Sequence, residues 1–207
     1  MNVVFLKRFF TWAGIIILVL YLGLVIYRIP AVLEKQKTEE TVTRIHAARL
    51  TLADVMGENL PPPPDPVLKD ATIQGIDANG NGIRDDVELA IFEKYPDSAR
   101  VRAALLQYAK ALQMELVEVF NSETLVAAIQ EEERADFCIA ETAPQLSSSS
   151  SAEDMRKVFA LTDQRSREVG DLVLNTAERK QRYEEIFQHM TSYGSLEEKS
   201  CDIFTDF

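Results

Sequence analysis

The sequence predicts an all-α protein in which a single N-terminal transmembrane helix is followed by a small helical domain with one polar loop. A long uncharged apolar run lies near the N-terminus, and apolar residues beyond it recur at helical spacing. No stretch shows the strict alternation of a half-buried strand. We expect a tail at 1–8, an anchor at 9–29, a juxtamembrane helix at 30–60, a proline-rich spacer at 61–76, the polar loop at 77–88 and a helical domain at 89–207.

The apolar run Phe9–Tyr27 contains nineteen residues without a charged side chain. A helix of this length spans about 28 Å, close to the hydrocarbon thickness of a bilayer, about 30 Å. Trp12 and Tyr27 lie near its two ends, where aromatic rings favour the membrane interface. The run is too long for a cleavable signal peptide, and Arg28–Ala31 is a poor cleavage site, so we expect an uncleaved single-pass anchor.

The segment between the anchor and the polar loop is expected to hold a juxtamembrane helix that docks on the domain. Its apolar residues recur at spacings of three and four or their sums, and Gly57 is expected to end the helix. The stripe consists of Val42, Ile45, Leu52, Val55 and Met56. Pro61–Pro64 and Pro66 then predict a stiff extended spacer, because the basic residues expected beside a proline-rich recognition motif are missing.

Downstream of the loop, four helices are predicted from caps and apolar spacing. They run over Asp85–Tyr95, from Asp97 or Ser98 to about Val119, from the cap Ser122 to Cys138, and over about Ala152–Met190. Ser150 and Glu153 are expected to form the capping box of the last helix. The acidic run Glu131–Glu133 is expected to lie on the solvent side of the third helix.

The polar loop Asp77–Glu88 reads DANGNGIRDDVE and fits the calcium-loop pattern D-x-[DN]-x-[DN]-G-x5-E at every specified position. Calcium takes six to eight oxygen ligands, and alternate residues of a tight loop can aim oxygens at one centre. Gly82 permits the sharp turn at the sixth position. The expected Ca²⁺ ligands are the side chains of Asp77, Asn79, Asn81, Asp85 and Glu88 and the carbonyl of Ile83.

These twelve residues resemble EF-hand-like calcium loops and, more closely, the loops of thrombospondin type 3 repeats. The loop differs from an EF-hand in having Arg84 at the eighth position, normally apolar, and in having no room for an entering helix after the prolines. The resemblance implies ligand roles only. The alternative is a polar turn, Asn79–Gly82, followed by a helix whose first turn is acidic.

Two cysteines, Cys138 and Cys201, predict one disulfide if the domain is exported, and buried or free thiols otherwise. The basic residues on the two sides of the anchor nearly balance, so they do not decide its orientation. The cysteine pair and a loop suited to millimolar calcium both favour an N-terminus in the cytosol and the bulk of the chain outside. Because the architecture of the chain is simple, we expect a bacterial inner-membrane protein whose bulk lies in the periplasm.

The net charge and the absence of catalytic motifs argue against two classes of function, nucleic-acid binding and catalysis. The net charge of −11, from 22 basic and 33 acidic residues, argues against nucleic-acid binding. The sequence has no nucleophile elbow, phosphate loop, His-Glu-x-x-His or Cys-x-x-Cys motif, so we expect no enzyme. The leading hypothesis is a binding or scaffold protein with a structural Ca²⁺ and an unidentified envelope protein as partner. The alternatives are an envelope enzyme using scattered carboxylates and a cytosol-facing membrane adaptor with an empty loop.

Overall fold

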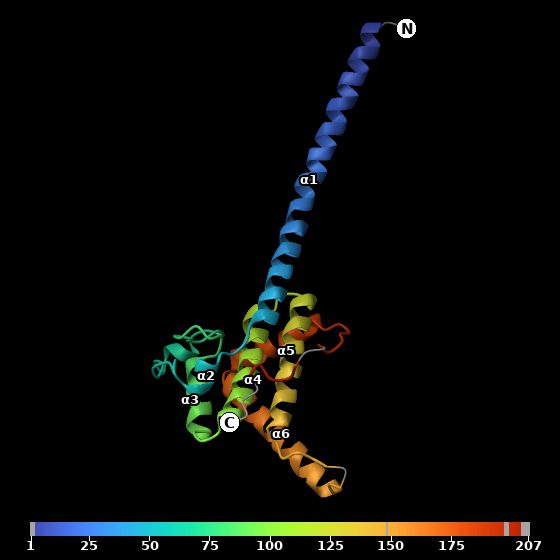
Figure 1. Cartoon of the computed structure of the whole chain (residues 1–207). Coiled ribbons are helices and arrows are strands. Elements are labelled where there is room, and N and C mark those ends of the chain that lie inside the picture. Colours follow the sequence, from blue (N-terminus) through green and yellow to red (C-terminus); the bar gives the residue numbers. More distant parts are fainter. Residues whose placement is uncertain (1–2, 148, 197–198, 204–207) are drawn as a thin grey trace. The chain divides into compact units, whose positions relative to one another are not determined.

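The computed structural model describes residues 3–147, 149–196 and 199–203, with side chains from residue 8 onward. In these ranges the chain forms α-helices and two short 3₁₀ turns and contains no strand, which confirms the predicted all-α class (Figure 1). The chain divides into two compact units, Met1–Glu40 and Thr41–Phe207. The first unit holds the apolar run, and the second holds the polar loop.

Helix α1 (Val3–Ala47) contains the whole apolar run Phe9–Tyr27. Among the described residues, it is the one helix long and apolar enough to cross a membrane. None of its most apolar window is buried within the structure. The apolar core helix of a soluble protein would be covered by its neighbours, whereas a lipid-facing helix is not. The predicted anchor 9–29 therefore lies in a helix with the length and composition of a membrane span.

The predicted juxtamembrane helix is broken into two. Helix α1 ends at Ala47, and a separate short helix, α2 (Leu52–Met56), follows. Thr51 starts α2 by accepting a hydrogen bond from the backbone N–H of Asp54, while the carboxylate of Asp54 accepts one from the N–H of Thr51. This capping box restarts the helical phase, so the apolar stripe does not continue across the break.

The break decides which stripe residues reach the core. Ile45 and Val55 are fully buried, but Leu52 is 53% exposed and Met56 is also exposed, contrary to the expected stripe. Gly57 ends α2 with a φ of 78°, as predicted. The spacer that follows has no regular secondary structure over residues 61–65. Asp65 then accepts hydrogen bonds from the N–H groups of Val67 and Leu68, and a turn leads into the 3₁₀ turn η1 (Leu68–Asp70).

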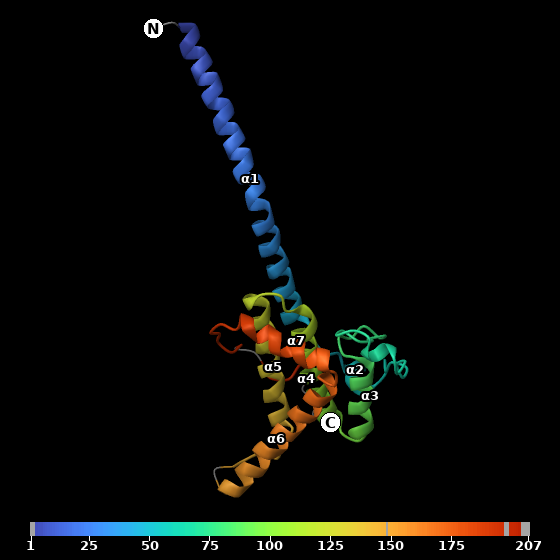
Figure 2. The same ribbon diagram turned by 180° about the vertical axis from the view of Figure 1, so that it is seen from behind.

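Helix α4 (Ala99–Glu118) is the centre of the second unit. It packs against α2, α3 (Asp85–Lys94), α5 (Ser122–Glu141), α6 (Ala152–Val173) and α7 (Ala177–Ile186). Seen from behind, α6 and α7 lie against it (Figure 2). Most of its residues are buried, on nearly every side, and not only the predicted stripe. A helix surrounded in this way forms the core of its domain.

The predicted last helix, 152–190, is also divided. Helix α6 ends at Val173, α7 restarts at Ala177, and a 3₁₀ turn, η2 (Phe187–His189), completes it. Thr176 caps α7 by accepting a hydrogen bond from the N–H of Arg179. The capping box of α6 is Ser151 with Asp154 rather than Ser150 with Glu153. Likewise, Asn121 caps α5 in place of Ser122, whereas Ser98 caps α4 as predicted.

The predicted disulfide is present. Cys138 on α5 is bonded to Cys201 near the C-terminus, with a Cα–Cα distance of 4.9 Å. The segment around Cys201 is also held by polar contacts: Gln107 donates to the carbonyl of Ser200, and Arg134 donates to the carboxylate of Asp202. The disulfide and these contacts fix the C-terminal segment against α4 and α5.

The acidic run on α5 does not form a solvent-facing surface. Glu131 is only 2% exposed, and its carboxylate accepts hydrogen bonds from Arg49 and Arg134 and contacts the Nδ1 of His46 at 2.9 Å. Glu132 and Glu133 are half-buried. The expectation of a solvent-facing surface was wrong because two of the partners of Glu131, His46 and Arg49, come from a distant part of the chain.

Candidate metal centre

The backbone of the loop 77–88 closes on itself. The N–H of Asp85, the first residue of α3, donates to the carbonyl of Ile76 over 2.9 Å. Gly80 and Gly82 turn the chain with φ values of 72° and 87°, in the left-handed region where other residues are strained. A Cβ on Gly82 would also lie 3.3 Å from the Cε of Lys110. The positive φ therefore favours the glycine expected at this turn, and a side chain there would also displace Lys110 slightly.

Asp77 organises the turn from the first loop position. Its Oδ1 accepts hydrogen bonds from the N–H groups of Gly80 and Asn81 at 2.9 and 3.2 Å, and its Oδ2 accepts one from Gly82 at 2.9 Å. A carboxylate that accepts several backbone N–H groups fixes the loop around itself. Both oxygens lie inside the curve of the loop.

The carboxylate of Glu88, at the twelfth position, accepts hydrogen bonds from two asparagine side chains of the loop. Its Oε2 accepts a hydrogen bond from the Nδ2 of Asn79, and its Oε1 accepts one from the Nδ2 of Asn81, each over 3.0 Å. Three of the six predicted ligand residues thus meet. Rotation of each amide by 180° would turn its oxygen toward Glu88. This rotation would break the hydrogen bond from the Nδ2 of Asn79 to the carbonyl of Asn59 and the one that the Oδ1 of Asn81 accepts from the N–H of Ile83.

The carboxylates of α3 that face the loop are buried. Burial raises the pKa of Glu88 to about 7, although the amides of Asn79 and Asn81 act in the opposite direction. Burial likewise raises the pKa of Asp85, while the N–H of Ala78 opposes the shift. The Oδ2 of Asp85 is buried and has no hydrogen-bond partner among the described residues. An unpartnered carboxylate oxygen in a low-dielectric site favours a bound cation or a proton.

Residues 83 and 84 turn away from the loop. The Ile83 side chain is buried in the core, which leaves its carbonyl as the ligand candidate at the seventh position. Arg84 is buried too, and its guanidinium reaches the α6–α7 corner. It donates to the carbonyls of Val173 at 2.9 Å and Leu172 at 3.1 Å, and pairs with Asp86 at 2.8 Å. Arg84, which replaces the apolar residue usual at the eighth position of an EF-hand loop, thus holds the loop against the rest of the domain.

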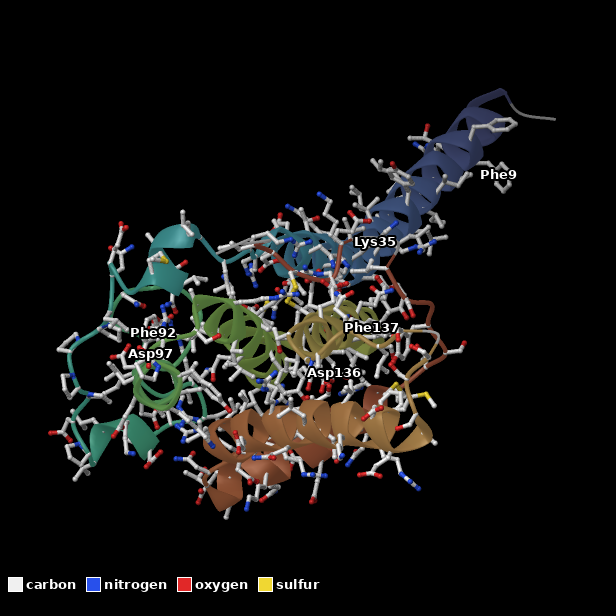
Figure 3. The ribbon with its side chains drawn as sticks, turned by 60° about the horizontal axis from the view of Figure 1, so that its bottom comes forward. Phe9, Lys35, Phe92, Asp97, Asp136 and Phe137 are labelled. Atoms are coloured by element: carbon white, nitrogen blue, oxygen red, sulfur yellow. A yellow bond between two sulfur atoms is a disulfide. The ribbon has the colours of Figure 1, made fainter. Side chains whose placement is uncertain are left out.

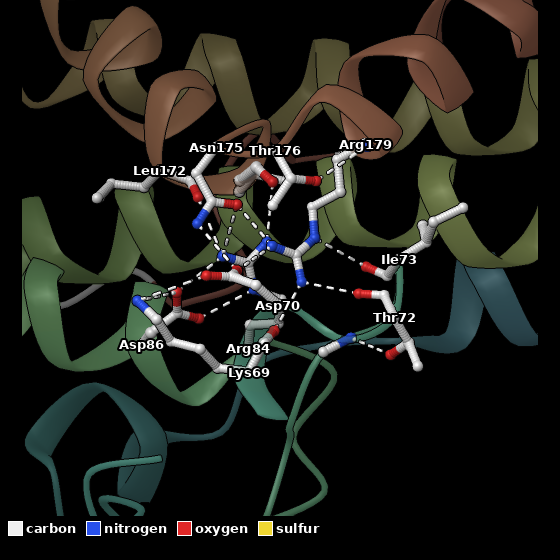
Figure 4. A network of polar contacts seen from close by, with 12 residues as sticks. Lys69, Asp70, Thr72, Ile73, Arg84, Asp86, Leu172, Asn175, Thr176 and Arg179 are labelled. Carbon is white, nitrogen blue, oxygen red and sulfur yellow. Dashed lines mark hydrogen bonds and ion pairs between the residues drawn. The ribbon is translucent and has the colours of Figure 1, made fainter. Parts of the chain in front are cut away.

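A second buried arginine, Arg179 on α7, fixes the segment before the loop (Figure 4). Its guanidinium pairs with the carboxylate of Asp70 at 2.6 Å. It also donates to the carbonyls of Lys69, Thr72 and Ile73 at 2.8, 2.9 and 3.1 Å. Arg84 and Arg179 together connect the loop and the segment before it to the α6–α7 corner.

The geometry brings together only part of the predicted ligand set. Asn79, Asn81 and Glu88 converge, whereas Asp77 and the Oδ1 of Asp85 accept hydrogen bonds from the loop's own backbone. Across the described ranges, no three His, Cys, Asp or Glu side chains gather closely enough to hold a metal ion. The amide and carbonyl oxygens of this loop are therefore needed to complete any cation site.

Sequence reasoning missed a second pair of acids, the fully buried Glu115 on α4 and the half-buried Glu132 on α5. Glu115 lies three residues after Leu112, on the predicted apolar stripe, and an acid at such a position is the signal that was available. Sequence reasoning also missed the two buried arginines, whose partners lie far away along the chain. No protein-family model, curated protein or solved structure matches the chain.

Proposed function

We propose that this protein is a single-pass membrane protein whose helical unit stands outside the cytosol and holds one structural Ca²⁺ in the loop 77–88. The observation that carries the proposal is the convergence of Asn79 and Asn81 on the buried carboxylate of Glu88. The loop has the spacing of a calcium site, and its oxygen donors suit a hard cation.

The ligand roles follow from the side chains available. The ligands are the side-chain oxygens of Asp77, Asn79, Asn81, Asp85 and Glu88 and the carbonyl of Ile83. On binding, the two amides rotate so that oxygens replace the Nδ2 atoms that now face Glu88. Three carboxylates and two neutral amides make a modestly charged site. Such a site suits the millimolar calcium found outside cells rather than the low levels of the cytosol.

The compartment proposal has two supports. The disulfide between Cys138 and Cys201 is typical of exported proteins, since the cytosol keeps thiols reduced. A weak calcium loop is also useful only where calcium is plentiful. We therefore place the helical unit in the periplasm of a bacterial inner-membrane protein, with the tail before the anchor in the cytosol.

The role of the ion in this proposal is structural: it fixes the conformation of the loop. Arg84 and Arg179 tie the loop and the segment before it to the α6–α7 corner, so fixing the loop also fixes that corner. A rigid, membrane-tethered helical unit is suited to binding or scaffolding another envelope protein. No catalytic role is required for this function.

Thermal unfolding of the full chain in detergent tests the calcium site. Wild type is compared with Asp77→Ala and Glu88→Gln, in chelator and in millimolar calcium. Glu93→Gln is the matched control, because Glu93 is an exposed acid on the same helix. Calcium is expected to raise the melting temperature of wild type and Glu93→Gln only, because a ligand stabilises the state that binds it. Equal calcium-induced shifts of the melting temperature in all four proteins would show that the loop does not bind calcium.

A further inference from the structure

Lys110 of α4 lies against the turn of the loop 77–88. Helix α4 lies between α3, which carries Phe92, and α5, which carries Phe137 (Figure 3). A Cβ at Gly82 would lie 3.3 Å from the Cε of Lys110, 3.7 Å from its Cγ and 3.9 Å from its Cδ. The alkyl chain of Lys110 therefore covers the turn at the sixth loop position.

The ammonium of Lys110 is held by a carbonyl group rather than by a carboxylate. Its Nζ donates a hydrogen bond to the carbonyl of Arg49 over 3.1 Å. Its side chain is half-buried, and within the described ranges no ion pair joins it to an acid. A charge that is partly removed from water and has no paired acid is weakly screened, so it acts on charged groups several ångströms away.

The turn that Lys110 covers is the one that Asp77 organises. The N–H of Gly82 donates a hydrogen bond to the Oδ2 of Asp77 over 2.9 Å, so Gly82 contacts both the lysine and this carboxylate. Burial lowers the pKa of Lys110, and the negative charges of Asp202, Asp54 and Asp77 oppose this shift. Asp77 is also the first of the proposed calcium ligands. The ammonium and a bound ion would therefore be attracted by the same carboxylate.

Lys110 and the loop also line a common cavity of about 220 Å³. Residues 80–82 contribute its loop side, and they include Asn81, another of the proposed ligands. Arg44 is a second cation of the lining, and its guanidinium pairs with Glu118. Of the two cations in this described lining, Lys110 is thus the one whose charge is not compensated by an ion pair.

We propose that Lys110 sets the calcium affinity of the loop 77–88 by repelling the ion, so that the loop fills only where calcium is plentiful. This inference rests on the proposed function. Lys110 is not a ligand, because an ammonium has no acceptor for a metal. A bound Ca²⁺ would bring two positive charges to the carboxylate of Asp77, close to this ammonium, and like charges in a partly dry site repel. The charge of the site is one of the properties that tune the affinity of such loops.

A purely structural role is the alternative for Lys110. It holds the carbonyl of Arg49, which lies in the segment that leads from α1 into α2. The two roles predict different effects of removing the charge. Loss of a structural contact weakens calcium binding or leaves it unchanged, whereas loss of a competing charge strengthens it.

Calorimetric titration of the full chain in detergent with calcium chloride distinguishes the two roles. Lys110→Met keeps an unbranched side chain over the turn without the charge, and Lys110→Gln also keeps N–H donors. Both variants are expected to bind calcium at least about fivefold more tightly than wild type. Lys110→Arg keeps the charge, and Lys157→Met removes an exposed lysine of α6. Both of these controls should stay within about twofold of wild type.

The results separate this inference from the proposed function. Calcium binding by wild type with no tighter binding by Lys110→Met and Lys110→Gln would overturn the role of Lys110 and leave the calcium site in place. If Lys110→Met does not fold, Lys110→Gln decides the question. Absence of calcium binding in wild type and in both variants would overturn the calcium site and this inference with it.

Melting temperatures of the same proteins in chelator provide a second readout. A lower melting temperature of Lys110→Met in chelator, combined with tighter calcium binding, supports a competing charge, because destabilisation alone does not tighten binding. A lower melting temperature combined with unchanged or weaker calcium binding would show that Lys110 acts only through its contact with Arg49.

Discussion

The Nη1 of Arg84 donates a hydrogen bond to the carbonyl oxygen of Val173 over 2.9 Å, joining residues 89 positions apart. Val173 is the last residue of α6, where carbonyl groups lack helical partners and carry partial negative charge. A buried guanidinium is well placed there because it supplies the missing donors. This contact joins the loop 77–88 directly to the end of α6.

Replacing Arg84 is therefore expected to destabilise the second unit strongly. Arg84→Ala removes the donors to Val173 and Leu172 and leaves the partly buried Asp86 with only Lys69, at 3.7 Å, as an ion-pair partner. The free energy of unfolding should fall by about 3–5 kcal/mol, the usual cost of breaking a buried pair. Urea unfolding measures it. Arg156→Ala, at an exposed position of α6, should change it by less than about 0.5 kcal/mol. Similar values for the two variants would contradict this role.

Gly82 and Gly80 offer a matched test of the turn. Both have positive φ, but a Cβ at Gly80 meets no atom within 4 Å, whereas one at Gly82 meets Lys110. Each change to Ala costs about 1–2 kcal/mol for the left-handed backbone. Gly82→Ala should cost more than Gly80→Ala, because Lys110 must also move. Chemical unfolding in chelator checks the order, and the reverse order would contradict the described loop.

Glu88 should make stability depend on pH when calcium is absent. Its folded pKa of about 7 lies above the ordinary value of 4.5, so the folded state binds more protons between these pH values. Its contribution is fully present below pH 4.5 and is lost as pH rises through 7, a decrease of about 3 kcal/mol in the free energy of unfolding. Unfolding of wild type and Glu88→Gln is compared in chelator from pH 5 to 8.

The comparison isolates Glu88 because Asp85, Glu115 and Glu132 have raised pKa values in both proteins. The difference between wild type and variant should fall as pH rises. Calcium should reverse this trend in the wild type, since the ion binds the ionised carboxylate. A difference that does not change with pH would mean that Glu88 titrates normally.

The disulfide is expected to be a major source of stability. It closes a loop of 63 residues, for which chain entropy gives about 4 kcal/mol. A double variant, Cys138→Ala with Cys201→Ala, should unfold at lower urea than the oxidised wild type, and the reductant-treated wild type should match the variant. Equal urea midpoints with and without the bond would show that the polar contacts of the C-terminal segment suffice.

Topology can be tested with a single reporter. Gln145→Cys places a thiol at an exposed position after α5, away from the disulfide partners. In intact bacterial spheroplasts, a membrane-impermeant maleimide should label it, because we place this unit outside the cytosol. Labelling only after permeabilisation would place the unit in the cytosol instead.

The fold class and the helix regions were predictable because they depend on local signals. Apolar spacing identified the helical regions, Gly57 ended its helix, and the presence of only two cysteines predicted their bond. The two unexpected breaks, at Thr51 and Thr176, come from side chains that cap a new helix. Threonine is common at many positions in proteins, so neither residue marks a helix start by itself. Each caps a helix only because of the conformation of the backbone that precedes it.

The buried charges were not predictable, for a different physical reason. Glu131 is buried because His46 and Arg49, more than 80 residues earlier, meet its carboxylate beside Arg134 of the same helix. Arg179 is buried because carbonyls of residues 69, 72 and 73 accept hydrogen bonds from it. Burying a charge is favourable only with such partners, and periodicity along one helix does not contain them. In the loop, the pattern identified the residues but not their arrangement around Glu88.

The central claim is a calcium ion held by Asp77–Glu88, and calorimetric titration of the full chain with calcium tests it most directly. We expect about one ion per chain, with a dissociation constant of roughly 10⁻⁴–10⁻³ M as in extracellular calcium modules. Binding should be absent in Asp77→Ala and intact in Glu93→Gln. If calcium gives no heat beyond dilution, or Asp77→Ala binds like the wild type, the loop is a polar turn and the claim fails.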